Sequence, residues 1–154
     1  MARLLLDTSA IYATVVRQDR NHEAAARLFR EQVQSGRGFV ILDLVFAESL
    51  TLMKARWGAQ AAVRAGKRLR EPTVFQWRSL SPVREQQTWR TFERYQGEDW
   101  SYTDCAVLAL ARQLGHSEVS TFDRHFGQVP GVIPVPGLQW GPVVQPLVGP
   151  LGSP

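Results

Sequence analysis

Four acidic residues lie far apart in the sequence, and each stands at the end of a predicted strand or near the start of a predicted helix. They are Asp7, Glu48, Asp104 and Asp123. Carboxylates that converge repel one another, so most can stay ionised only if a positive charge lies among them. A divalent cation meets that need, and hard oxygen ligands suit Mg²⁺ or Mn²⁺. Such ions support in-line phosphoryl displacement, so phosphate-ester chemistry is the first hypothesis.

Two of these acids directly follow predicted strands. A short buried strand is predicted at residues 3–6, before Asp7, and another at 119–122, before Asp123. In open parallel sheets, ligands bind in the crevice outside the carboxyl ends of the strands. Both carboxylates are therefore expected at the edge of the sheet where a functional site usually lies.

The other two acids are expected at the same edge because of the helices that carry them. Asp104 lies in the first turn of a predicted helix at 104–114, which begins at this edge because it leads into the strand before Asp123. Glu48 lies in the first or second turn of a predicted helix at 44–57, after a strand at 39–42. The sequence thus predicts that four acids converge.

Each acid also has an ordinary structural alternative. Asp7 and Asp123 follow strands, where an aspartate often only caps a helix or turn. Asp104 fits a capping box with Ser101, which stands three residues before it. Glu48 lies in an otherwise apolar segment, so a functional role is slightly favoured over a solvent-facing one. The combination, rather than any single residue, points to a site.

Strands alternate with helices along the rest of the chain, which predicts an α/β sandwich with a mostly parallel sheet. A polar loop and a proline or glycine usually separate the elements. The further predicted elements are helices at 10–17, 22–34, 59–70 and 81–95, and strands at 74–77 and, as a last edge strand, 132–133. From Pro130 onward, proline and glycine recur, so a domain at 1–136 and an irregular tail at 137–154 are predicted.

Composition limits the class of protein. The 154 residues are 44% hydrophobic and 21% charged, close to globular averages, so disorder is not expected. The formal net charge of +4 suits a polyanionic partner but does not establish one. A helix face bearing Arg64, Lys67, Arg68 and Arg70 is basic, although such a face is usually only solvated.

Cysteine and hydropathy indicate a cytoplasmic protein without membrane association. Cys105 is the only cysteine, so no intrachain disulfide can form, and a small buried hydrophobe is a better interpretation than a nucleophile. The apolar run at 4–6 ends at Asp7, too early for a signal peptide. No stretch approaches the roughly 18 apolar residues of a membrane-spanning helix.

Five short motifs, in order and with their spacing, resemble the PIN-domain family and, within it, the VapC-like toxins of prokaryotic toxin–antitoxin pairs. One motif is weak evidence, but five in the expected order between residues 5 and 126 are specific. The motifs are Leu5-Leu6-Asp7-Thr8-Ser9-Ala10, Asn21-His22-Glu23-x-Ala25, Ala47-Glu48-Ser49-Leu50, Ser101-x-Thr103-Asp104-Cys105 and Thr121-Phe122-Asp123-Arg124-His125-Phe126.

This resemblance implies an α/β/α sandwich and an endoribonuclease that depends on Mg²⁺ or Mn²⁺. It implies a homodimer inhibited by a VapB-like antitoxin, a segment of which reaches into the acidic groove. The family's acidic positions, catalytic and metal-binding, match Asp7, Glu48, Asp104 and Asp123, and its hydroxyl-bearing helper positions match Thr8 or Ser9 and Thr121. The tail after Pro136 departs from the compact ending expected of the family.

RNA must approach an acidic pocket, so basic or aromatic side chains are expected beside it. Arg124 and His125 directly follow Asp123 and are the nearest basic candidates. Trp100, beside the Asp104 motif, is the best candidate for stacking on a base.

Other functions remain open as alternatives. A haloacid-dehalogenase-like phosphatase needs a second aspartate two residues after Asp7, where this chain has Ser9. A receiver domain needs a lysine near its last strands, and no lysine follows Lys67. A non-catalytic PIN-like module that binds RNA or protein, and a housekeeping RNA-processing nuclease, are the closer rivals. The presence of all four acids disfavours the first, and only genomic context would separate the second from a toxin.

Overall fold

Residues 4–6 and 39–42 form two inner strands of uninterrupted apolar residues, as expected for parallel strands covered on both faces. The computed structural model describes residues 3–115, 118–129 and 131–136. Its five-stranded sheet has the order β3-β2-β1-β4-β5, and every neighbouring pair is parallel. The strands are β1 (Leu4–Leu6), β2 (Phe39–Leu42), β3 (Phe75–Arg78), β4 (Glu118–Ser120) and β5 (Ile133–Val135).

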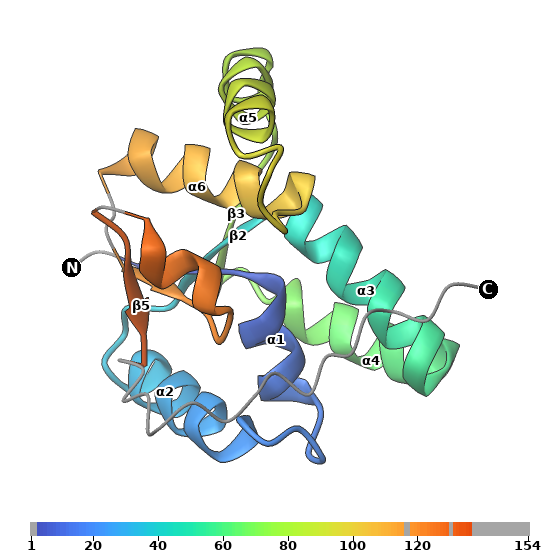
Figure 1. The fold of residues 1–154 in the computed structure, drawn as a ribbon. Coiled ribbons are helices and arrows are strands. Elements are labelled where there is room, and N and C mark those ends of the chain that lie inside the picture. Colours follow the sequence, from blue (N-terminus) through green and yellow to red (C-terminus); the bar gives the residue numbers. More distant parts are fainter. Residues whose placement is uncertain (1–2, 116–117, 130, 137–154) are drawn as a thin grey trace.

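Helices cover both faces of this sheet. In Figure 1, α1 and α2 lie on one side of the strands, α6 lies on the other with α5 outside it, and α3 and α4 form a hairpin beside α1. The helices are α1 (Thr8–Val15), α2 (His22–Gln34), α3 (Asp43–Trp57), α4 (Ala59–Leu69), α5 (Pro82–Arg94) and α6 (Tyr102–Leu114), with a short 3-10 helix, η1 (Arg124–Gln128).

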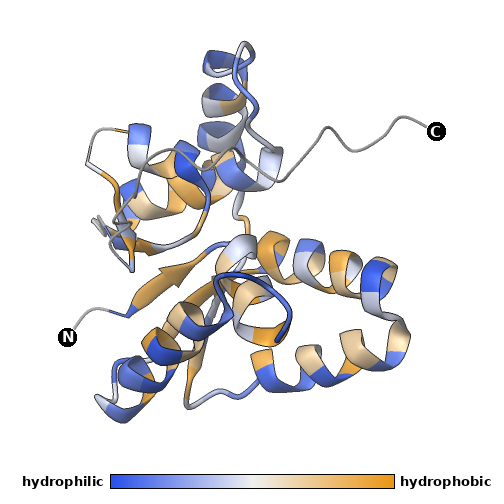
Figure 2. Ribbon diagram, turned by 60° about the horizontal axis from the view of Figure 1, so that its bottom comes forward, coloured by the Kyte–Doolittle hydropathy of each residue, from blue (hydrophilic) through white to orange (hydrophobic). Residues whose placement is uncertain are grey.

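The core lies between the sheet and α6. Seven consecutive residues of α6, Cys105–Ala111, are buried, because this helix packs against the sheet on one side and α5 on the other. Figure 2 shows hydrophobic residues concentrated in the strands and α6, whereas α5 is mostly hydrophilic. Gly115 ends α6 in the left-handed conformation (φ 65°), as its position after the last apolar residue predicts.

The predicted α/β/α sandwich with a mostly parallel sheet is confirmed. Two differences in the ends of elements bear on the site. The first helix begins at Thr8, two residues earlier than predicted, with Asp7 as its N-cap. The strand predicted at 119–122 ends at Ser120, because the N–H of Phe122 donates to the Ser9 hydroxyl instead of continuing a ladder. The first difference arises from a local cap between Asp7 and Ala10, and the second from a contact between segments distant in the sequence.

The predicted tail at 137–154 lies outside the described residues. Among the residues that are described, no helix is both long and apolar enough to cross a membrane.

Candidate active site

Asp7 joins the end of β1 to the start of α1 and is almost completely buried, with 3% of its surface exposed. As the N-cap of α1, its Oδ1 accepts a hydrogen bond of 2.9 Å from the N–H of Ala10. The cap that the sequence suggests as an alternative to function is therefore present. It uses part of the hydrogen-bonding capacity of one carboxylate oxygen, so a cap and a ligand can coexist.

Two hydroxyl groups complete the surroundings of the Asp7 carboxylate. Ser9 Oγ donates to Oδ1 at 2.8 Å, and Thr121 Oγ1 donates to Oδ2 at 2.5 Å. The same hydroxyl oxygens accept from the loop after β4: Ser9 Oγ from the N–H of Phe122 (2.9 Å) and Thr121 Oγ1 from the N–H of Asp123 (3.0 Å). The hydroxyls thus tie the loop after β4 to Asp7. The two loop N–H groups were not predicted, since no side-chain pattern marks a backbone donor.

Burial raises the pKa of Asp7 to about 7. The hydrogen bonds from Thr121, Ala10 and Ser9 act in the opposite direction, and the negative charge of Asp104 raises the pKa further. Asp7 is therefore a carboxyl group that the surrounding protein does not fully stabilise in its charged form.

Asp104 lies in the first turn of α6, where it forms the predicted capping box with Ser101. Its N–H donates to Ser101 Oγ at 3.0 Å, and its Oδ2 accepts from the N–H of Ser101 at 2.9 Å. The pKa of Asp104 is raised to about 6, chiefly by burial and also by the charges of Asp123 and Glu48. The capping box is confirmed. The same carboxyl group is also destabilised in its charged form by burial and by neighbouring negative charges.

Glu48 lies in the second turn of α3 and reaches α1. Thr8 Oγ1 donates to Glu48 Oε2 at 2.5 Å, so the hydroxyl orients this carboxylate across the gap between the two helices. Both hydroxyl positions that the family resemblance left open are therefore used: Ser9 holds Asp7, and Thr8 holds Glu48.

Asp123 is the N-cap of η1, where its Oδ1 accepts from the N–H of His125 at 3.0 Å. Nδ1 of His125 lies 2.8 Å from the same oxygen, so the imidazole is in direct contact with this carboxylate. The capping alternative is thus also present at Asp123.

The negative charges of neighbouring acids raise the pKa of both Asp7 and Asp104. Asp104 raises the pKa of Asp7, while Asp123 and Glu48 raise that of Asp104. Such mutual effects require proximity, because charges separated by more than about 8–10 Å of solution are screened. The topology explains it: β1 and β4 are neighbours, and α1, α3 and α6 begin at the same end of the sheet.

The donor set suits a hard divalent cation, because it consists of carboxylate and hydroxyl oxygens and its negative charges oppose one another. Within the described residues, however, no three acidic, histidine or cysteine side chains are placed to hold a metal ion. Mg²⁺ usually binds through one or two carboxylates and keeps several waters, so a closed protein cage is not required.

Trp100 was wrongly predicted as a residue that stacks on bases. Only 8% of its surface is exposed, and its ring packs against Tyr95, His125 and Phe126. The closeness of Trp100 to Asp104 in the sequence therefore does not predict whether the tryptophan ring is exposed. The positions of Arg124 and His125 in η1, directly after Asp123, agree with the sequence.

Cys105 is a buried free thiol, and burial raises its pKa to about 11, so it stays protonated near neutral pH. The prediction of a small buried hydrophobe is confirmed.

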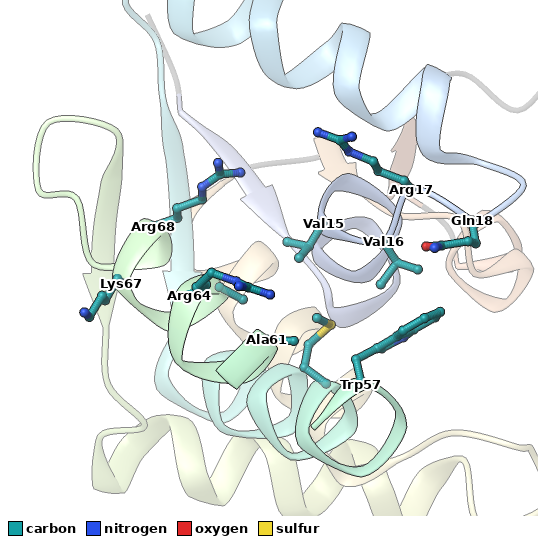
Figure 3. A pocket seen from close by; sticks show the side chains of 11 residues that line it. Val15, Val16, Arg17, Gln18, Trp57, Ala61, Arg64, Lys67 and Arg68 are labelled. Atoms are coloured by element: carbon teal, nitrogen blue, oxygen red, sulfur yellow. The ribbon is translucent and has the colours of Figure 1, made fainter. Parts of the chain in front are cut away.

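A separate pocket of about 450 Å³ lies at the other end of α1. Its apolar side chains include Val15, Val16 and Met53, and Figure 3 shows Arg17 and Arg64 around this space with Trp57 at one side. Lys67 and Arg68 also line it, so three of the four residues of the predicted basic helix face border the pocket. Arg70 does not, because its guanidinium lies over the ring of Trp77 at 5.4 Å.

Known proteins resemble the chain in sequence and in fold. The sequence pattern of the PIN domain family matches residues 4–132. The chain is 28% identical over 123 residues, 80% of this chain and 91% of the relative, to the 23S rRNA-specific endonuclease VapC20 of Mycobacterium tuberculosis. The crystal structure of that protein, described as a sarcin–ricin loop cleaving toxin, has a TM-score of 0.73 at 27% identity and covers 80% of this chain and 92% of its own.

Two more distant structures share the fold. VapBC2 of Rickettsia felis, bound to a promoter DNA fragment, has a TM-score of 0.63 at 11% identity and covers 84% of this chain and 94% of its own. A toxin–antitoxin complex of Klebsiella pneumoniae has a TM-score of 0.56 at 18% identity, with coverage of 84% and 95%.

Proposed function

The chain belongs to the PIN domain family, and from that premise we propose that it is a metal-dependent endoribonuclease, the toxin of a toxin–antitoxin pair. The observation that carries the proposal is the electrostatic coupling of the acids at one edge of the sheet, with Asp7 and Asp104 both raised in pKa. An arrangement that served only to cap helices would gain nothing from bringing these charges together.

The side chains of this site divide into ligands and residues that orient them. Asp7 and Asp104 would be the principal metal ligands, and Glu48 and Asp123 would complete the site directly or through water. A divalent cation, when bound, neutralises charge on the phosphate and makes water a better nucleophile. Ser9 and Thr121 fix the plane of the Asp7 carboxylate, while Thr8 fixes that of Glu48.

The residues of η1 lie where substrate would approach. His125, when protonated, places a positive charge beside Asp123 and offsets part of the repulsion between the acidic edge and a phosphate. Arg124 precedes it in the same short helix and is the second candidate for contact with RNA.

The class of substrate comes from the relatives. VapC20 is named for its action on 23S rRNA, and structured ribosomal RNA is therefore the first substrate to test. The rival functions are a non-catalytic module and a housekeeping nuclease, and the cleavage assay distinguishes the first from a toxin.

The test is cleavage of total RNA with Mg²⁺ or Mn²⁺, with the ends mapped by sequencing. We expect defined cleavage by the native protein, none in EDTA, and a loss of at least about 100-fold in Asp104→Asn, because an aligned charged ligand is removed. Asp99→Asn is the matched control, since Asp99 is an exposed acid nearby in the sequence. Full activity in EDTA, or in Asp104→Asn, would contradict the proposed mechanism.

The proposed partners are an antitoxin and a second copy of the chain. Two of the similar structures are toxin–antitoxin assemblies. The pocket at the end of α1 has an apolar interior and a basic rim, which suits an amphipathic peptide with acidic residues. We propose this pocket as a docking site for the antitoxin.

A further inference from the structure

A second basic groove lies between α5 and α6, apart from the acidic edge. Its volume is about 380 Å³, and charged or amide side chains form most of its lining. The polar residues that line it are Gln87, Arg90, Thr91, Arg94, Arg112 and Gln113.

The charges in this groove are all of one sign. No acidic side chain lines it, and among the residues that the structure describes Arg90, Arg94 and Arg112 form no ion pair. Guanidinium groups stay charged at any physiological pH, so three around one groove repel one another. A bound anion would relieve that repulsion.

Helix geometry places the arginines together. Arg90 and Arg94 are four residues apart and therefore lie on one side of α5. Arg112 faces them from α6. An arginine in the last turn of a helix, such as Arg94 or Arg112, is also explained by the helix dipole. The dipole does not explain why residues of two helices face the same groove.

An amide group adds a further hydrogen-bond donor. Arg84 Nε donates to Gln113 Oε1 at 2.5 Å, which fixes the side chain of Gln113 and leaves its amide nitrogen as a donor at the groove. Guanidinium and amide donors without acceptors suit phosphate oxygens, which accept hydrogen bonds and carry charge.

The groove is connected to the candidate active site through α6. Asp104 lies in the first turn of this helix and Arg112 in the last, eight residues apart, which corresponds to about 12 Å along the helix axis. An acidic edge repels the RNA backbone, so affinity must come from basic surfaces at such distances.

We propose that the α5–α6 groove binds backbone phosphates of the RNA that flank the cleaved bond. This inference rests on the proposed function. It implies that the groove contributes affinity without sequence preference, because phosphates are the same at every position. It also implies that RNA too short to reach the groove is cleaved less efficiently.

The test measures binding of a 5′-labelled single-stranded RNA of about 20 nucleotides as a function of salt, in the Asp104→Asn background. Each phosphate contact contributes about 0.7 to the slope of log K against log salt for a single strand. We expect Arg90→Gln/Arg94→Gln/Arg112→Gln to reduce that slope by about 2, and the corresponding triple lysine variant to keep it.

The matched control removes the same charge from the opposite face of the sheet. Arg20, Arg27 and Arg37 are exposed beside or on α2, and their replacement by Gln should change the slope by less than one contact. Equal effects of the two triple Gln variants would overturn the inference, because long-range charge alone would then explain the binding. Circular dichroism checks that each variant is folded.

A second readout separates this inference from the proposed function. In the otherwise native enzyme, the α5–α6 triple Gln variant should raise KM about tenfold or more and change kcat little. Cleavage by the triple Gln variant with an unchanged KM would overturn only the inference about the groove. Absence of cleavage by the native enzyme would overturn the proposed function. Loss of antitoxin binding with unchanged RNA binding would assign the groove to a protein partner and also overturn the inference.

Discussion

At the scale of single residues, the carboxyl group of Asp7 is the most consequential side chain. It is buried and near a second acid, and its hydrogen bonds only partly compensate for the loss of water, so its pKa rises from 3.8 to about 7. Between these values the folded protein binds a proton that the unfolded chain has lost. Stability therefore falls as pH rises from about 4 to about 7, and is level above that.

Because the charged form of Asp7 destabilises the folded state, we predict that Asp7→Asn makes the metal-free protein more stable at pH 8. The interval from 3.8 to about 7 corresponds to at most about 4 kcal/mol, at about 1.4 kcal/mol per pH unit. We expect a gain of roughly 1–3 kcal/mol, because the amide must rearrange its bond with Thr121. The measurement is urea unfolding in EDTA at pH 4, 6 and 8.

The variant should differ little from the native protein at pH 4, where the carboxyl group of Asp7 is protonated in the folded state. A smaller slope should remain in the variant, because burial also raises the pKa of Asp104 to about 6. A native protein that is equally stable at pH 4 and pH 8 would disprove the assignment of the pKa.

Residue type and local position were enough to predict at which edge of the sheet the acids lie. They were not enough to predict the surroundings of the aromatic side chains. Asp7, Asp104 and Glu48 could be placed because their positions relative to strands and helices follow from the chain pattern. Trp100 could not, because its burial depends on Tyr95 and Phe126 packing around it. The coexistence of a cap and a charged site at Asp104 also lay beyond the sequence, which presents them as alternatives.

At the scale of elements, the start of α6 fixes the position of Asp104. Ser101 and Asp104 exchange hydrogen bonds of 3.0 and 2.9 Å, whereas Ser81 at the start of α5 accepts a single longer bond of 3.4 Å from Arg84. The reciprocal pair satisfies two N–H groups that the helix itself leaves without partners.

We therefore predict that Ser101→Ala costs about 1–2 kcal/mol of unfolding free energy, and Ser81→Ala about 0.5 kcal/mol or less. Both changes remove the same hydroxyl from a helix start, so each is a control for the other. Equal losses in urea denaturation would show that the 3.0 Å bond to the Ser101 hydroxyl contributes no more than the 3.4 Å bond to the Ser81 hydroxyl.

The elements themselves were largely predictable, because continuous apolar strands and amphipathic helices have distinct periods. Their ends were less so. The strand before Asp123 stops at Ser120 because Ser9 and Thr121 redirect the next residues toward Asp7. A local pattern cannot contain a contact between residues separated by more than 100 positions.

At the scale of the whole molecule, the pocket proposed for the antitoxin and the acidic site lie at opposite ends of α1. Asp7 caps the start of this helix, and Val15, Val16 and Arg17 line the pocket at its end. Binding of a partner at the pocket and cleavage at the acids should therefore be separable by mutation.

We predict that Arg64→Glu/Arg68→Glu lowers affinity for the co-expressed antitoxin at least about tenfold, because the basic rim becomes acidic. RNA cleavage should stay within about twofold of the native rate. The measurements are copurification and calorimetry, with Arg27→Glu/Arg30→Glu on α2 as the charge-matched control. Unchanged affinity in the pocket variant would place the antitoxin elsewhere.

The fold class could be predicted because strands and helices alternate, and a parallel sheet follows from that alternation. The order β3-β2-β1-β4-β5 could not, although it decides which loops meet. The predicted homodimer and the predicted boundary at residue 136 remain predictions.

The hydrogen bond from Thr121 to Asp7 spans 114 positions of the chain. A ribosome therefore makes Asp7 more than 100 residues before the strand that precedes Thr121. Until β4 leaves the exit tunnel and pairs with β1, the carboxyl group lacks its neighbours Thr121 and Asp123. Under the proposed function, we therefore expect a nascent chain to become active only after residues 118–123 have been translated and paired with β1.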